Sequence, residues 1–597
     1  MRNWKQHMKS IKCPVFIICI FFSQSIFAQY FEFNWSDKID YTNNKNGFFS
    51  GFINSSGMYI YALNSNYAVS PINSNKKLKI IAYNRTTLSE VASVALKGFP
   101  ENKGTEKVYD SLNYFKTVVN EDRVMVFWTK LLNTDSTLTE ELYVESFKFD
   151  LERDKTIKLI YSVTEIVDYK HSQFTPSKII VIANEDASAL MIGSEMILPS
   201  KKIGLKYMLI DGELKAQKLN TIDLGVNPLA EDKGLLCSYE MGIDQNIYIR
   251  STMIPTREEQ KQANNLSSFL RLTVINPISN NKIDLEMRDE KKTITDYSYL
   301  IMENKTKVIG FFGDLEKDPT GIDRQGIFYV EIDSETLKNT GLNYTFFEKT
   351  TLNKLVPKSR SKRKRPKKDE IRLYTEEELN TRFDIENIFL AEDSGVVVFF
   401  SQKYNYSEIT SRSGMDGRNI YKTEDFCEKN NVSAMRITNE GLVKWVTTVA
   451  RNITYEGTNI SDVRVVNKAN LFYMFCGSVD PKKISKKKRN NTVELVDKIE
   501  YTTFDATTGR AKVNELLLNE KSTLKKDLKT MNPQSIEVFD GNFYFNKMHV
   551  KQKPLWYVAN VLCFPSIYYS VLSGNTKKAT GDLGVIVLMS GKPSKKK

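Results

Sequence analysis

The chain has 597 residues, with 85 Lys and Arg against 72 Asp and Glu, which gives a formal net charge of +13. Its hydrophobic fraction of 41% and aromatic fraction of 11% are enough for a large core and exclude wholesale disorder. With 28 Gly and 6 Cys, the chain is neither collagen-like nor a disulfide-dense scaffold.

Residues 1–28 have the pattern of a secretory signal peptide. Basic residues fill the first part of this segment, an apolar run follows at 15–22, and the segment ends at the small residue Ala28. An uncleaved membrane anchor is the alternative, but the apolar run is about half of the roughly 20 residues that a membrane span needs. We therefore expect cleavage after Ala28, export across the inner membrane, a periplasmic or outer-membrane-associated protein, and no transmembrane segment in the mature chain.

One pattern recurs through the rest of the chain: a first hairpin of two apolar strands, a connection, and a second hairpin with Asp, Asn or Gly in its turn. The turn residues of the second hairpins are Asn84, Asp150, Asp211, Asn276, Asp333, Asn439, Asp505 and Asn575. Their successive spacings are 66, 61, 65, 57, 106, 66 and 70 residues, so all but one fall in a narrow range. The sequence therefore predicts a repeat of four short antiparallel strands, here called a, b, c and d.

A four-stranded sheet cannot cover its own apolar faces, so the repeats must pack against one another. Radial packing of such sheets gives a β-propeller, which leaves only short edges exposed. We predict an all-β fold, a single propeller domain over residues 29–592 with about eight blades, or seven as the alternative. The units lie at 45–97, 113–163, 176–222, 235–290, 295–350, 384–450, 460–520 and 534–592. Tandem β-sandwiches or two smaller propellers are the other architectures considered.

The second hairpins also carry a family resemblance. FDATTGRAKV at 504–513 and ITNEGLVKW at 437–445 resemble the turns of pyrroloquinoline-quinone-type (PQQ-like) and WD40-like propeller repeats. FDATTGR is also what a tight hairpin needs physically, an acceptor side chain early and a positive-φ residue late, so no cofactor follows from it. The leader and the composition resemble, in style alone, uncharacterised secreted propeller proteins of Bacteroidetes-type bacteria.

The connections after strand b are longer than the turns after strand a. They are predicted at 131–141, 253–269, 313–325, 403–432, 478–498 and 548–566. Antiparallel alternation places these connections, and those from strand d to the next strand a, on one face of the ring. Long loops on a rigid scaffold commonly carry binding residues, so this face is the predicted working surface.

Two basic runs lie in connections that belong to this face. The first lies in a basic inserted loop at 352–372 and the second between strands b and c of the seventh unit; a short basic tail follows at 593–597. The predicted binding residues are Lys358, Arg360, Lys362, Arg363, Lys364, Arg365, Lys367, Lys368, Lys482, Lys483, Lys486, Lys487, Lys488 and Arg489. Their expected partners are an envelope protein or a polyanionic surface such as lipid headgroups or an acidic glycan. Neither run is interleaved with base-stacking aromatics, which disfavours nucleic acid, and a solvated loop without a partner is the alternative.

Motifs for catalysis or cofactor binding are weak in this sequence. Asp314, Glu316, Asp318 and Asp323 form a weak calcium candidate, but Pro319 and Gln325 stand where an EF-hand needs Gly and Glu, which favours a solvated acidic turn. No cofactor and no catalytic residue is assigned. Among the cysteines, Cys237 and Cys476 lie in apolar runs and are predicted to be buried apolar residues of strands.

These observations predict a secreted, noncatalytic propeller that acts as a binding or assembly module at the bacterial cell envelope. A propeller enzyme, such as a glycan-directed hydrolase, is the alternative function, and a quinoprotein-like enzyme is a more distant one.

Overall fold

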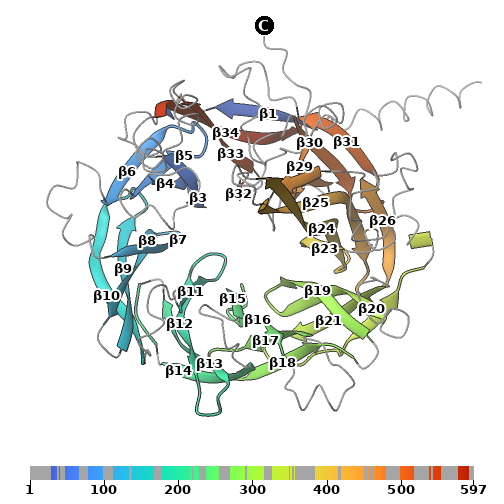
Figure 1. Cartoon of the computed structure of the whole chain (residues 1–597), viewed down its shortest axis with the longest axis horizontal. Helices are drawn as coiled ribbons and strands as arrows, with labels where there is room; N and C mark the ends of the chain where they lie inside the picture. The colour runs from blue at the N-terminus through green and yellow to red at the C-terminus, as the bar shows by residue number, and fades with distance from the viewer. Residues whose placement is uncertain are drawn as a thin grey trace, which may run out of the picture.

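The computed structural model describes residues 29–35, 39–40, 48–65, 78–97, 112–133, 137–166, 178–226 except 212 and 218, 237–254, 269–289, 292–314, 326–348, 350–351, 355, 383–413, 419–449, 453–456, 463–468, 471–478, 498–516, 537–539, 542–552 and 576–590. The strands of these segments form eight antiparallel sheets. The sheets follow one another around a ring, with strand a of each toward the centre and strand d toward the rim (Figure 1). The chain is therefore a β-propeller, as its repeats predict.

Six blades are sheets of four consecutive strands, here numbered as blades 1 to 5 and 7. Blade 1 contains β3 (Phe48–Ser56), β4 (Tyr59–Ser65), β5 (Leu78–Asn84) and β6 (Glu90–Lys97). Blade 2 contains β7 (Asn113–Val119), β8 (Arg123–Asn133), β9 (Thr137–Lys148) and β10 (Arg153–Ile166). Blade 3 contains β11 (Ile179–Ala183), β12 (Ala189–Ile197), β13 (Ile203–Asp211) and β14 (Asn220–Val226). Blade 4 contains β15 (Cys237–Met241), β16 (Ile247–Met253), β17 (Phe269–Ile275) and β18 (Lys282–Met287). Blade 5 contains β19 (Lys292–Ile301), β20 (Lys305–Asp314), β21 (Gly326–Asp333) and β22 (Asn343–Phe346). Blade 7 contains β28 (Val463–Lys468), β29 (Leu471–Ser478), β30 (Lys498–Asp505) and β31 (Ala511–Leu516).

Blades 6 and 8 each have a fifth strand. Blade 6 contains β23 (Asp384–Leu390), β24 (Val396–Ser413), β25 (Asn419–Ile437), β26 (Val443–Val449) and the short β27 (Ile453–Glu456). Blade 8 combines the C-terminal strands β32 (Glu537–Phe539), β33 (Asn542–Gln552) and β34 (Thr576–Ser590) with the N-terminal strands β1 (Gln29–Trp35) and β2 (Ile39–Asp40).

Blade 8 closes the ring with both ends of the repeat region. β34 pairs with β33 on one side and with β1 on the other, in a register from Gln29 opposite Ser590 to Trp35 opposite Gly584. The prediction of a second hairpin around Asn575 was therefore wrong. β34 is one continuous strand c, and strand d comes from the N-terminal segment (Figure 1).

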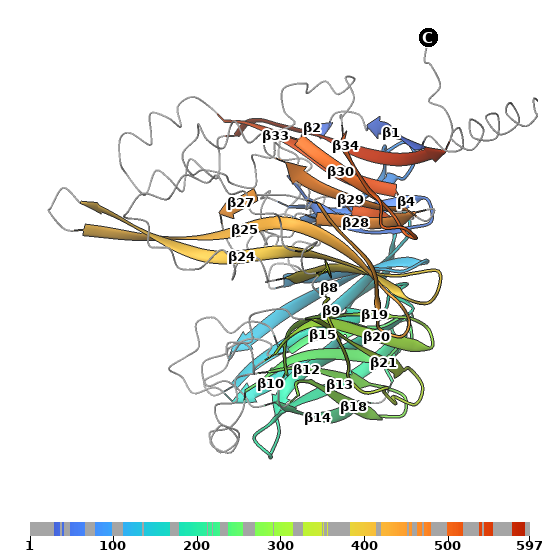
Figure 2. The same cartoon turned by 90° about the vertical axis from the view of Figure 1, so that its right-hand side faces the viewer.

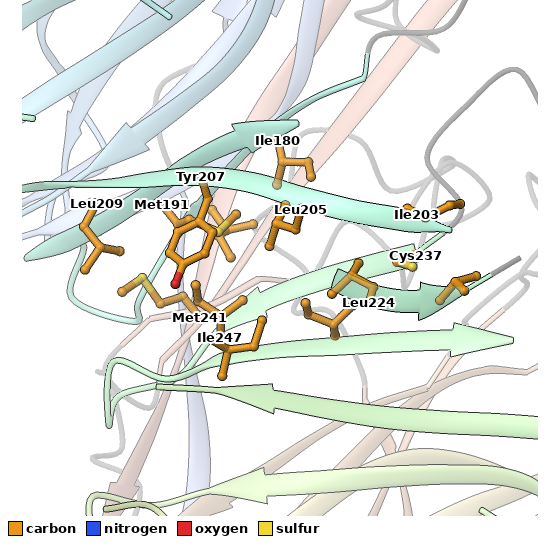
Figure 3. Close-up of a cluster of buried hydrophobic side chains, with 14 residues drawn as sticks. Ile180, Met191, Ile203, Leu205, Tyr207, Leu209, Leu224, Cys237, Met241 and Ile247 are labelled. Carbon is orange, nitrogen blue, oxygen red and sulfur yellow. The ribbon is translucent and has the colours of Figure 1, made fainter. Parts of the chain in front are cut away.

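The core lies between neighbouring blades, because each sheet faces another sheet on both sides. Between blades 3 and 4, for example, Leu205, Tyr207 and Leu209 of β13 face Met241 and Ile247 (Figure 3). Tyr207 is fully buried, and its hydroxyl donates a hydrogen bond to Asn280 Oδ1 of the next blade at 2.8 Å. Apolar clusters thus join each pair of neighbouring blades from blade 1 to blade 7, and individual hydrogen bonds align the blades.

The turns between strands c and d have the chemistry that the sequence predicts. Asp505 Oδ1 accepts hydrogen bonds from the amides of Thr507 and Thr508 at 3.1 and 2.7 Å, and Gly509 follows with a φ of +70°. In blade 5, Asp333 Oδ1 accepts hydrogen bonds from the amide and the hydroxyl of Thr336, and the positive-φ residue is Leu337, with a φ of 55°. Leu337 is 5% exposed, so burial of its side chain offsets the backbone strain.

Candidate functional site

Antiparallel alternation divides the ring into two faces. We call the face with the a-to-b and c-to-d turns the turn face, and the face with the b-to-c and d-to-a connections the connection face. Contacts between turns of adjacent blades confirm the first grouping, since Asn246 in an a-to-b turn donates through Nδ2 to the carbonyl of Ser334 in a c-to-d turn at 2.8 Å. The described turns are short and interlocked, which leaves the connection face as the side that varies between blades.

The most prominent feature of the connection face is a long hairpin of β24 and β25. The two strands stay paired from Ser401 opposite Val432 out to Ser413 opposite Asn419. At about 3.3 Å per residue this arm is on the order of 40 Å long, and Figure 2 shows it extending far to one side of the ring. β27 pairs with β25 between Phe426 and Lys429 and widens part of the arm to three strands.

This arm corrects part of the sequence-based prediction. The segment 403–432 was expected to be an irregular loop, and most of it is instead paired strand. The same holds on a smaller scale in blade 2, where β8 and β9 remain paired as far as Asn133 opposite Leu138. Both segments do lie on the predicted face, because they continue strands b and c beyond the blade.

The predicted basic binding residues lie outside the described residues. The run 358–368 belongs to the connection between β22 and β23, and the run 482–489 belongs to the connection between β29 and β30. The described ends of the second connection, Ser478 and Lys498, are paired with each other. Of the calcium candidates, Asp314 is the last residue of β20 and the other three lie outside the described residues. No group of three or more His, Cys, Asp or Glu side chains able to hold a metal ion occurs within the described segments.

A pocket of about 390 Å³ lies between blades 4 and 5 toward the connection face. Six of its seven lining residues are polar, namely Ser238, Arg250, Ser251, Thr252, Asp296 and Tyr297, and the seventh is Leu270. Ser238 lies at the start of strand a (β15), and Thr252 lies at the end of strand b (β16). Both of these strand ends are on the connection face. Concavities between packed units are a common place for small ligands, and the polar groups that converge here would orient one.

Arg250 is the main cationic group of this pocket. Its guanidinium carbon lies 4.8 Å from the ring centroid of Tyr297 and 4.8 Å from that of Tyr299, both on strand a of blade 5. Within the described residues, no carboxylate lies within ion-pair distance of Arg250. The arginine is thus held by two aromatic rings, and its hydrogen-bonding groups remain available to the pocket.

The two rings are themselves fixed by neighbouring groups. The Tyr299 hydroxyl donates to Glu240 Oε2 at 2.7 Å, and its ring stacks on Tyr248 with the centroids 5.4 Å apart. The Tyr297 hydroxyl donates to the carbonyl of Arg271 at 3.2 Å. Burial raises the pKa of both tyrosines, so both stay neutral hydrogen-bond donors at physiological pH.

Asp296 supplies the negative charge of the pocket and links it to a third blade. Its Oδ2 accepts a hydrogen bond from the amide of Ile385 in β23 at 3.0 Å. A register shift between Ile294 and Asp296 on β19 marks a local irregularity beside this residue. Side chains from two blades therefore form the walls of the pocket, and a third blade holds one of them in place.

Cys237 lies next to the pocket but is chemically quiet. It is 7% exposed, and its amide donates to Glu195 Oε1 at 3.0 Å. Burial, with a smaller contribution from Glu195, raises the pKa of its thiol to about 12, so it stays protonated near neutral pH. Cys237 and Cys476 are both buried, at 7% and 2% exposed, which confirms their prediction as buried residues of strands.

The sequence did not reveal this pocket. Its residues come from β15, β16, β17 and β19, and no local motif joins them. The only available signal was the pair of tyrosines in TDYSYL at 295–300, which alternate along one face of a strand.

Comparisons with known proteins support no assignment beyond the fold. No family model matches the chain, and no curated protein matches it. A prolyl endopeptidase structure matches with 7% identity and a TM-score of 0.36, covering 85% of this chain and 53% of that one, so the chain spans about half of that protein. The WD40 domain of SCAP from fission yeast matches with 8% identity and a TM-score of 0.31, covering 83% and 91% of the two chains.

A third similar structure is the β-propeller domain of the Trilobed protease from Pyrococcus furiosus. It shares 8% identity at a TM-score of 0.30, with 78% of this chain and 95% of that one covered. Within the described segments, no helix has the length and apolar character to cross a membrane. The strand pairing establishes the propeller fold by itself.

Proposed function

We propose that this protein is a secreted, noncatalytic binding or assembly module of the bacterial cell envelope, and that it works through its connection face. The observation that carries the proposal is the arm of β24 and β25, which extends on the order of 40 Å from a ring whose described turns on the other face are short. A paired hairpin of this length increases the surface on one side of a rigid scaffold, where binding functions are commonly found.

Charge supports the same face. The connection with the run 358–368 follows a strand d, and the connection with the run 482–489 follows a strand b, so both begin and end on the connection face. Outside the leader, these two runs and the tail, the chain is net acidic. Two basic segments on one side of an acidic ring would attract polyanionic partners such as anionic lipid headgroups or acidic glycans.

The test compares the wild type with a variant in which every Lys and Arg of both runs is changed to Gln. The wild type should sediment with envelope membranes at low salt and dissociate as salt rises, and the variant should remain largely in the supernatant. Changing Lys595, Lys596 and Lys597 to Gln provides a control, because the tail lies outside the two runs. Equal sedimentation of the wild type and the double-run variant at low salt would overturn the electrostatic part of the proposal.

A further inference from the structure

The pocket between blades 4 and 5 combines a fixed cation, several hydroxyl groups and one carboxylate. The geometry points to a binding site for one residue of an acidic sugar, a pyranose that carries a carboxylate, in contact with Arg250, Thr252 and Asp296. This site is separate from the basic runs, so it stands or falls independently of the proposed envelope-binding function.

Arg250 would bind the sugar carboxylate. A guanidinium presents paired N–H groups that match a carboxylate in a bidentate arrangement. The rings of Tyr297 and Tyr299 hold the arginine at 4.8 Å each, and the partners of those rings hold them in turn. The side chain therefore loses little additional freedom when a ligand binds, which favours affinity.

The other lining groups suit the ring of a sugar. Ser238 and Thr252 are exposed at the pocket and can both donate and accept hydrogen bonds, and Asp296 can accept hydrogen bonds from sugar hydroxyls. Leu270 adds one apolar contact, which matches the C–H face of a pyranose. A volume of about 390 Å³ is at the small end of the range for ligand pockets, which fits one ring better than a long oligosaccharide.

The charge balance distinguishes a carboxylate from a phosphate. Among the described lining residues, Arg250 is the only cationic side chain, and the Asp296 carboxylate lies in the same pocket. A phosphate monoester with nearly two negative charges would be repelled by Asp296 and only partly compensated by one arginine. A carboxylate carries a single charge, so Asp296 repels it less than a phosphate monoester and Arg250 matches it one to one.

Calorimetric titration of the wild type with methyl glucuronoside, methyl glucoside, glutamate and inorganic phosphate tests this inference. The uronoside should bind, and the neutral glucoside should bind at least about tenfold more weakly, because it lacks the charged hydrogen bonds to Arg250. Arg250→Gln should lower uronoside affinity by a similar factor. Thr252→Val should lower affinity while leaving thermal stability unchanged, since Thr252 is exposed.

The matched control is Arg288→Gln. Arg288 also lies over an aromatic ring, 3.8 Å from the centroid of Phe269, but it does not line the pocket. The Arg288→Gln variant should retain wild-type affinity for the uronoside. The uronoside should therefore raise the melting temperature of Arg288→Gln but not that of Arg250→Gln. Absence of uronoside binding to the wild type, or equal affinity of the wild type and Arg250→Gln, would overturn the site. Equal or tighter binding of glucoside, glutamate or phosphate would overturn the proposed ligand class.

Discussion

The c-to-d turns offer a quantitative test of how blades are held in register. Gly441 in blade 6 and Gly509 in blade 7 each stand directly before the residue that closes the turn, with φ values of +81° and +70°. In each case a threonine of the preceding blade donates to the glycine carbonyl, Thr345 at 3.0 Å and Thr447 at 2.6 Å. The two glycines differ mainly in what a side chain would meet.

A Cβ atom at position 441 would lie 3.4 Å from Tyr329 Cβ, which is close to ordinary contact. A Cβ atom at position 509 would lie only 2.5 Å from two atoms of the Trp445 ring, so that ring would have to move. Gly441→Ala therefore has mainly the cost of a left-handed backbone, about 1–2 kcal/mol. Gly509→Ala has the same cost plus about 1–3 kcal/mol for overpacking at the junction of blades 6 and 7.

Urea unfolding of both variants measures this difference as a shift of the midpoint at unchanged slope. We expect Gly509→Ala to be the less stable variant, and we expect Trp445→Leu to recover part of the loss in the double variant Gly509→Ala/Trp445→Leu. Equal destabilisation by the two alanines, or no recovery in the double variant, would refute the packing argument and leave backbone strain as the whole effect.

Three further predictions follow from buried charges, tyrosines and ring closure. Lys307→Met should lower the free energy of unfolding in urea by about 2 kcal/mol. The fully buried lysine pairs with Glu331 of its own blade at 3.1 Å and donates to Asn439 of blade 6 at 2.7 Å, and both contacts would be lost. A neutral or stabilising effect would contradict this. The free energy of unfolding should fall as pH rises from 10 to about 12. Folding raises the pKa of three tyrosines from 10.0 to about 12, so their contribution to stability is complete below pH 10 and is lost as the pH rises to about 12. The three are Tyr143, Tyr344 and Tyr473, with a hydrogen bond to Glu141 as the main cause for the first and burial for the other two; tyrosinate absorbance that rises without loss of the fold below pH 11 would count against it. Deletion of residues 29–35 should lower the melting temperature, since β34 would lose the partner that pairs with it from Gly584 to Ser590. Adding the missing peptide should restore part of the difference, and an unchanged melting temperature would argue against closure by β1.

The sequence predicted the propeller because its information is local and repeated. Each c-to-d turn needs an acceptor side chain and a positive-φ residue close together, and Asp505 with Gly509 shows how directly that need appears in the sequence. The turn chemistry repeats in blades 1 to 7, so the four-stranded repeat and the overall fold class were within reach of the sequence.

Ring closure and the pocket were not within reach, because they depend on contacts between distant segments. Nothing in Gln29–Trp35 specifies that it pairs with Thr576–Ser590. The pocket joins Ser238 to Tyr297 across two blades and is held by the amide of Ile385 in a third. The arm of blade 6 was interpreted as a loop because hairpins that extend beyond a blade lack the apolar runs of buried strands.

The central claim is that one face of the ring does the binding, and face-specific crosslinking tests it most directly. A photoreactive residue would be placed singly at Thr137, Thr252 or Asn419 on the connection face, and at Ser279, Glu440 or Thr507 in turns of the other face. Each variant would be irradiated in intact envelopes, and its crosslinked products would be identified by mass spectrometry. The account predicts a common partner captured from the connection-face positions and absent from the turn-face positions. Capture of that partner mainly from the turn face would contradict it.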